Sequence, residues 1–127
     1  MLDINQITLA VREIENAVLS PVIYMSETEY GVEFICFCFA EVTDDELFEL
    51  GERLTRELNV TAEVVDILEF TIADRLDIIS NTQLVYCEDP MIEQMLAMSV
   101  VEESRQEREK VRSMIKRKNE SGSYYLQ

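Results

Sequence analysis

Three carboxylates lie on two strand-like segments of this sequence, where together they could bind a metal ion. Glu33 opens the apolar segment 32–40, and Glu63 and Asp66 lie in the segment 60–68. If these segments pair in a sheet, carboxylates at corresponding heights could converge on a divalent cation, as in enzymes that transfer phosphoryl or nucleotidyl groups. Because the chain has 26 acidic residues, a solvated or sheet-edge carboxylate is the simpler interpretation of each.

Composition excludes most other catalytic sites. The 127-residue chain has no His, so a Ser-His-Asp triad, a Cys-His pair and a His-ligated metal cannot form within it. Its three Gly cannot supply a glycine-rich phosphate-binding loop. Cys36, Cys38 and Cys87 lack CxxC spacing and are predicted to be free, buried and reduced thiols. We expect a cytoplasmic protein, since no basic signal-peptide region and no apolar run of about 20 residues occurs.

The charge of the chain is strongly acidic but unevenly distributed. The formal net charge is −15, from 11 basic and 26 acidic side chains. Residues 1–104 carry four basic and 23 acidic side chains, whereas residues 105–127 carry seven basic and three acidic ones. A body of this charge repels a phosphate backbone, so direct nucleic-acid binding is not expected. The acidic surface either serves solubility or faces a basic or polar protein partner.

Eight secondary-structure elements are expected to position these side chains. Apolar residues recur every three or four positions in the expected helices, and strand-forming residues make short runs between them. The pattern predicts a helix over 3–19, strands over 22–25 and 32–40, a helix over 43–58, a strand over 60–68, a helix over 71–81, a strand over 84–87 and a helix over 91–118. The segment 26–31 is expected to be a polar turn.

This order of elements predicts an α/β fold. Helices alternate with strands, so we expect a mixed sheet of about four strands with helices packed on it and a long C-terminal helix. The hairpin-like link between the first two strands argues against a purely parallel sheet. The sequence predicts one domain over 1–118 and a flexible C-terminal tail over 119–127.

Four pieces between residues 46 and 112 occur in a characteristic order. They are the helix ELFELGERLTRELN, the strand VTAEVVDIL, the segment LVYCEDP and the long helix IEQMLAMSVVEESRQEREKVR. In this order and spacing, residues 44–112 resemble the second half of the minimal nucleotidyltransferases, which belong to the DNA-polymerase-β-like superfamily. The resemblance covers about half of the chain and implies a nucleotidyltransferase-like fold.

The first half departs from the pattern of that family. The family has Gly-Ser opening a helix after the first strand and Asp-x-Asp on the next strand, where they hold a triphosphate and two Mg²⁺ ions. Here Met25-Ser26 stands in place of Gly-Ser, and Gly31-Val32-Glu33 stands in place of Asp-x-Asp. Glu63 matches the third acidic position. Only Ser26, Glu33 and Glu63 remain of the motif, so we expect a degenerate, inactive nucleotidyltransferase.

The resemblance also implies a partner. Members of the family often pair with a helical HEPN-domain toxin, so we expect an antitoxin that restrains such a toxin by protein–protein contact, without a cofactor. Met91, Met95, Met98 and Met114 are candidate partner-binding residues, because Met adapts well to partner surfaces. The first three are spaced four and three residues apart, so an ordinary core position is the simpler interpretation for them. Two alternatives stay open: an active Mg²⁺- and ATP-dependent transferase that modifies its partner, and a homo-oligomeric scaffold or regulatory module.

Overall fold

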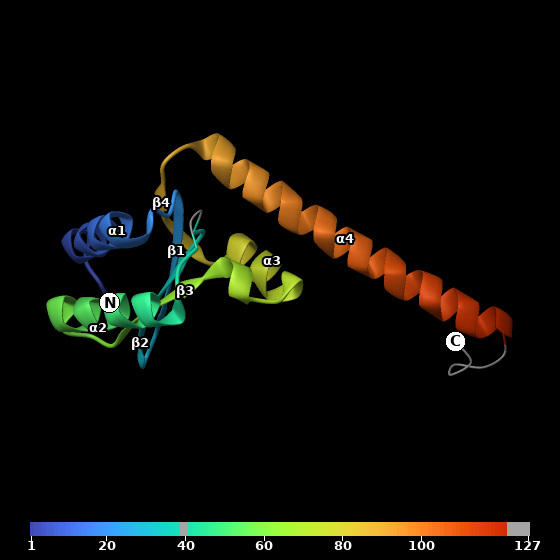
Figure 1. Cartoon of the computed structure of the whole chain (residues 1–127), viewed down its shortest axis with the longest axis horizontal. Coiled ribbons are helices and arrows are strands. Elements are labelled where there is room, and N and C mark those ends of the chain that lie inside the picture. The colour runs from blue at the N-terminus through green and yellow to red at the C-terminus, as the bar shows by residue number, and fades with distance from the viewer. Residues whose placement is uncertain (39–40, 122–127) are drawn as a thin grey trace.

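The computed structural model of the chain describes residues 1–38 and 41–121, with side chains as far as residue 116. The described residues form four α-helices, one 3₁₀-helix and a four-stranded sheet (Figure 1). The elements are α1 (Ile4–Val18), β1 (Val22–Thr28), β2 (Gly31–Cys36), α2 (Asp44–Leu58), β3 (Ala62–Asp66), η1 (Ile67–Glu69), α3 (Ile72–Asn81), β4 (Gln83–Cys87) and α4 (Pro90–Ser121). The predicted α/β fold is confirmed.

The sheet is mixed, with strand order β3-β2-β1-β4. β1 pairs antiparallel with both β2 and β4, whereas β2 and β3 pair in parallel. Helices α1 and α2 cover one face of the sheet, and α3 and the first part of α4 cover the other (Figure 1). Each face has its own core, because side chains alternate between the two faces along a strand. Ile14, Phe34 and Leu54 are buried on the face covered by α1 and α2. Tyr24, Ile35 and Val100 are buried on the face covered by α3 and α4.

The helices begin at the capping residues that the sequence provides. Asp3 and Gln6 form a reciprocal capping box at α1. The Thr43 side chain accepts a hydrogen bond from the Glu46 backbone N–H at α2, and Thr71 caps α3 in the same way. Because these contacts are local, the helix starts were visible in the sequence.

The first hairpin differs from the prediction. Residues 26–28 were expected in a turn, but they belong to β1, so the turn between β1 and β2 needs only Glu29 and Tyr30. Pairing with β2 along its whole length extends β1, and this pairing overrides the polar character of the segment. The second strand ends at Cys36 rather than at residue 40, and Phe39 and Ala40 lie outside the described residues.

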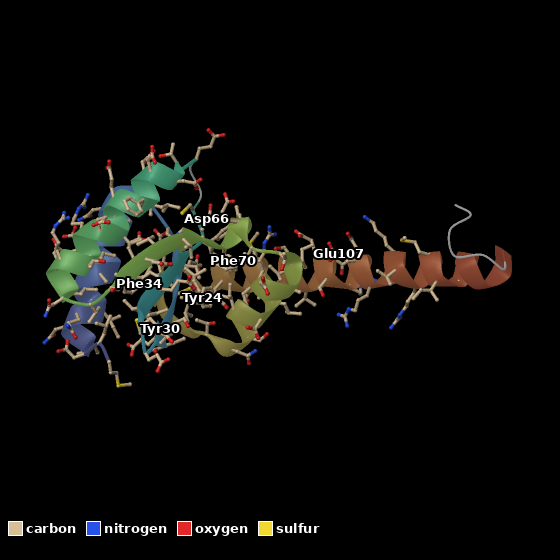
Figure 2. The ribbon with its side chains drawn as sticks, turned by 90° about the horizontal axis from the view of Figure 1, so that it is seen from below. Tyr24, Tyr30, Phe34, Asp66, Phe70 and Glu107 are labelled. Carbon is tan, nitrogen blue, oxygen red and sulfur yellow. The ribbon has the colours of Figure 1, made fainter. Side chains whose placement is uncertain are left out.

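Helix α4 extends far beyond the rest of the molecule (Figures 1 and 2). Leu96 and Val100 anchor its first part in the core, and Glu103 pairs with Arg75 of α3. All residues from 105 to 116 are exposed, and Glu107 marks this projecting part in Figure 2. The helix continues to Ser121, and residues 122–127 of the predicted tail lie outside the described residues. No helix of the described chain is both long and apolar enough to cross a membrane.

Candidate functional site

The sheet register brings Ser26, Glu33 and Glu63 into one row. Ser26 on β1 lies opposite Glu33 on β2, and Glu33 lies opposite Glu63 on β3. Because side chains alternate along a strand, Ser26 shares the face of Tyr24, and Glu33 shares the face of Ile35. The row therefore lies on the α3 and α4 face of the sheet, at the end nearest the β1–β2 turn. All three residues that the sequence analysis matched to the nucleotidyltransferase motif lie in this row.

The electrostatics of this row disfavour two ionised carboxylates. Partial burial, and then the charge of Glu63, raise the pKa of the Glu33 carboxyl above its usual range. A shallow cavity of 190 Å³ lies over Ser26, Glu33 and Glu63, and none of the described residues that line it is basic. Nothing on the described walls of this cavity neutralises the pair, and nothing positive there is placed to hold a triphosphate.

Asp66 does not join the row, although the sequence suggested that it could. It lies three residues after Glu63, so its side chain points to the other face of the sheet. There its carboxylate accepts a hydrogen bond of 3.1 Å from the Leu68 backbone N–H and caps η1. Among the described residues, no group of three or more His, Cys, Asp or Glu side chains is arranged to hold a metal ion.

Gly31, which the sequence analysis matched to the first Asp of the family motif, has a backbone conformation that an Asp would strain. Its φ is +156°, and a Cβ atom there would lie 2.3 Å from the Thr61 carbonyl oxygen. The Val32 N–H donates to the same Thr61 oxygen at 2.9 Å, so the close approach belongs to the β2–β3 pairing. An acidic side chain is therefore absent at residue 31, and the Thr61 carbonyl also occupies the space that its Cβ would need.

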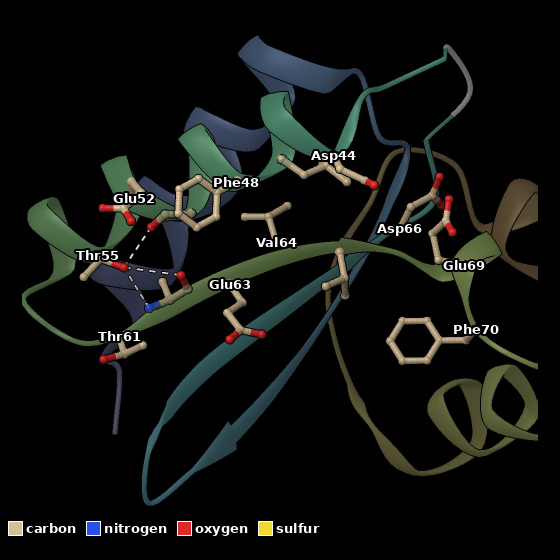
Figure 3. A pocket seen from close by; sticks show the side chains of 14 residues that line it. Asp44, Phe48, Glu52, Thr55, Thr61, Glu63, Val64, Asp66, Glu69 and Phe70 are labelled. Carbon is tan, nitrogen blue, oxygen red and sulfur yellow. Dashed lines mark hydrogen bonds between the residues drawn. The ribbon is translucent and has the colours of Figure 1, made fainter.

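A larger groove, which the sequence did not predict, lies beside the row at the free edge of β3 (Figure 3). Its volume is 580 Å³, and it lies between α2 on one side and β3, η1 and Phe70 on the other. Phe48 lines it with its side chain 68% exposed. Phe48 stands one position off the leucine stripe of α2, and Gly51 interrupts a helix interior; these two residues were the only sequence signals for the groove.

The methionines of the first part of α4 lie on the surface. The exposed fractions of Met91, Met95 and Met98 are 64%, 64% and 72%, so the interpretation of these residues as core is wrong. At 100° per residue they face away from Leu96, which is buried. Met114 is also exposed, on the projecting part of the helix. Their role in partner binding stays a prediction.

The cysteines agree with the sequence analysis except that Cys87, which was expected to be buried, is partly exposed. Cys36, Cys38 and Cys87 are all free, and the first two are buried. Burial raises the pKa of the Cys38 thiol to about 12, with a further contribution from the charge of Asp66. The two buried thiols are therefore poor nucleophiles at neutral pH.

Comparison with known proteins identifies the fold of the chain. No family model matches the sequence, and no curated protein matches it either. Among solved structures, a chain of the toxin–antitoxin complex MntA–HepT superposes with a TM-score of 0.75 at 9% identity, covering 90% of this chain and 97% of that one. The chain has the nucleotidyltransferase-like fold of the MntA antitoxin. The fold predicted from residues 44–112 is thus confirmed over nearly the whole length.

Two further solved structures have the same fold. One contains a tri-AMPylated HEPN toxin of Shewanella oneidensis in complex with an MNT antitoxin; its TM-score is 0.74 at 9% identity, covering 88% of this chain and 94% of that one. The other is a toxin–antitoxin with AMP-PNP, with a TM-score of 0.73 at 10% identity, covering 91% and 97%. At such low identity the likeness establishes the fold alone.

Proposed function

We propose that this chain is an antitoxin-type protein that binds a helical HEPN-domain toxin and restrains it by contact, without transferring a nucleotide to it. The observation that carries the proposal is the exposed surface of α4. The shared fold supports the choice of partner, because chains of this fold occur in complexes with HEPN toxins.

The projecting part of α4 is a helix that lacks tertiary support in the described structure. Residues 105–116 are all exposed, including the apolar side chains of Val111, Met114 and Ile115. Helical stability in proteins comes mostly from packing of an apolar face, and isolated helices of this length are marginal in water. A partner that covers these side chains would supply that packing, and Met91, Met95 and Met98 extend the apolar contact toward the body.

Restraint by contact fits the row of motif remnants. Glu33 and Glu63 repel one another, Gly31 stands where the family has a metal-binding Asp, and no described residue lining the cavity is basic. A two-metal clamp needs carboxylates that can all stay ionised around the ions. We therefore propose that the chain needs neither ATP nor Mg²⁺, and that its acidic body faces a basic surface of the toxin rather than nucleic acid.

One observation favours the alternative of an active transferase. Ser26, Glu33 and Glu63 stand opposite one another on three adjacent strands, which is the arrangement that a Mg²⁺-dependent transfer to the partner would use. This alternative requires that two carboxylates suffice, and it predicts that Mg²⁺ binds in a manner that depends on Glu33.

Co-expression with the product of the neighbouring gene tests the proposal. We expect the two proteins to purify together and the chain to relieve the toxicity of its partner. Substituting Met91, Met95 and Met98 together by Asp should weaken the complex without unfolding the chain, because all three side chains are exposed. Ile4→Asp is a control for placing an Asp on another exposed apolar position, because Ile4 is also exposed, on α1. Failure to form a complex, or equal effects of both variants, would contradict the proposal.

A further inference from the structure

We propose that the free edge of β3 binds an extended segment of a partner protein, bearing Lys or Arg, which adds to the sheet as a fifth strand. The site is the groove between α2 and β3, which we call the edge groove, lined among others by Phe48, Gly51, Thr55, Val64 and Glu69. The inference deepens the proposed function, on which it rests only for the identity of the partner.

The backbone of β3 offers hydrogen-bonding groups on its open side. In a parallel pair, alternate residues direct both their N–H and C=O groups to the same side. The Thr61 oxygen accepts from Val32 N–H of β2, so the groups of Ala62, the next residue, point away from β2. The Ala62 N–H indeed donates to the Thr55 hydroxyl of α2 at 2.9 Å. By the same alternation, both backbone groups of Val64 and the N–H of Asp66 face the edge groove, whereas the Asp66 C=O begins η1.

Thr55 and Gly51 define where an added strand would begin. The Thr55 hydroxyl occupies the edge position at Ala62, and it lies 2.8 Å from the Gly51 oxygen as well (Figure 3). No side chain of the described residues hydrogen-bonds to the Val64 backbone on the open side. A Cβ at Gly51 would lie 3.7 Å from the Val64 nitrogen, so a larger side chain there would fill the groove in front of this edge. The open edge therefore runs from Val64 to Asp66.

The walls of the groove can hold side chains of an added strand. Phe48 and Val64 point into it in Figure 3, and Leu47 and Phe70 also line it. In strand addition, backbone hydrogen bonds give affinity and pockets for alternate side chains give specificity. A volume of 580 Å³ is sufficient for apolar side chains of a short peptide.

Charge identifies the chemistry of the occupant. Five carboxylates surround the groove: Asp44, Glu52, Glu63, Asp66 and Glu69. None of the described residues that line it is basic. A basic chain would be attracted, whereas a nucleic acid would be repelled. Pairing with β3 of a second copy would place the same carboxylates against one another. The groove therefore selects a basic polypeptide rather than RNA or another copy of this chain.

Titration of the full chain with synthetic peptides tests the site. The probe is a capped peptide of alternating Lys and Val, and binding is followed by amide chemical shifts in NMR spectra. We expect the largest shifts at Val64 and Asp66. A peptide methylated on alternate backbone nitrogens should not bind, because it cannot form the edge hydrogen bonds, and a Glu-Val peptide should not bind either. Shifts centred elsewhere, or equal binding of the methylated peptide, would overturn the proposal.

Charge-reversal variants provide the matched control. Glu52 and Glu69 are exposed and line the groove. A double variant with Glu52→Lys and Glu69→Lys should weaken peptide binding about tenfold. The pair Glu49→Lys and Glu57→Lys makes the same charge change on α2 outside the groove and should change binding less than about twofold. Equal effects of the two pairs would show that binding is nonspecific and overturn the site.

The peptide titration needs no toxin, so the two proposals can fail separately. Peptide binding without any toxin complex would contradict the proposed function and support the edge groove. A toxin complex without peptide binding would support the proposed function and overturn the groove.

Discussion

Removing the charge of Glu33 should stabilise the protein. Glu33 lies opposite Glu63 across the parallel β2–β3 pair, and burial, followed by the charge of Glu63, raises its pKa. Ionising Glu33 therefore costs more in the folded than in the unfolded chain. Glu33→Gln keeps the shape and polarity of the side chain and removes this cost, so we expect a higher free energy of unfolding at neutral pH.

The size of the gain follows from the geometry of the pair. Like charges directly opposite on neighbouring strands cost about 0.2–1 kcal/mol, and partial burial of Glu33 adds to this cost. We expect a net gain of about 1 kcal/mol, which raises the Tm of a domain of this size by about 3–5 °C. The Glu33→Gln and Glu63→Gln double variant should gain less than the sum of the single variants, because either substitution removes the same repulsion.

The dependence of this gain on pH has a definite sign. A carboxyl whose folded-state pKa is raised contributes stability below its unfolded-state pKa, about 4.3, and loses it as the pH rises through the folded-state pKa. The difference between Glu33→Gln and the native protein should therefore be small near pH 4 and largest at neutral pH.

Urea denaturation followed by circular dichroism, across a pH series and with or without Mg²⁺, measures this difference. Glu29→Gln in the exposed β1–β2 turn is the control and should leave stability unchanged. A Glu33→Gln variant that is less stable than the native protein at neutral pH would show that the Glu33 charge does not destabilise the fold. Stabilisation by Mg²⁺ of the native protein alone would show that the two carboxylates act as metal ligands.

Three further predictions concern Gly31, Tyr24 and Cys38. Gly31→Asp, which restores the acidic residue of the family motif, should lower the free energy of unfolding by about 2–4 kcal/mol and confer no nucleotide transfer; a folded, active variant would contradict this. Tyr24→Phe removes the 3.2 Å hydrogen bond to Glu93 and should cost about 1 kcal/mol in urea denaturation; an unchanged midpoint would contradict it. Cys38, with a pKa of about 12, should react with iodoacetamide at pH 8 only after unfolding; rapid alkylation of Cys38 in the native protein, located by peptide mass spectrometry, would disprove the burial.

The fold was predictable because its determinants are local. Asp3, Thr43 and Thr71 each cap the helix that follows them, and the periodicity of apolar residues separates helices from strands. Asn59 ends α2 in the left-handed conformation that this residue tolerates, as expected for a helix end. The mixed character of the sheet followed from the short link between its first two strands.

The site was predictable only in part, because its geometry depends on contacts between distant residues. The motif comparison selected Ser26, Glu33 and Glu63, but their alignment requires the register of three strands. The position of Ser26 inside β1 could not be read from a polar segment, because pairing with β2 overrides local preference. The close approach of Gly31 to Thr61 spans 30 residues of sequence, and the edge groove depends on how α2 packs against β3.

The intact mass of the partner distinguishes restraint by contact from nucleotide transfer. The purified complex with the product of the neighbouring gene is incubated with ATP and Mg²⁺ and then separated for mass spectrometry. Restraint by contact predicts a stable complex, an inhibited partner and an unchanged partner mass, in the native protein and in Glu33→Ala alike. A nucleotide added to the partner by the native protein but not by Glu33→Ala would contradict the account and establish the chain as an active transferase.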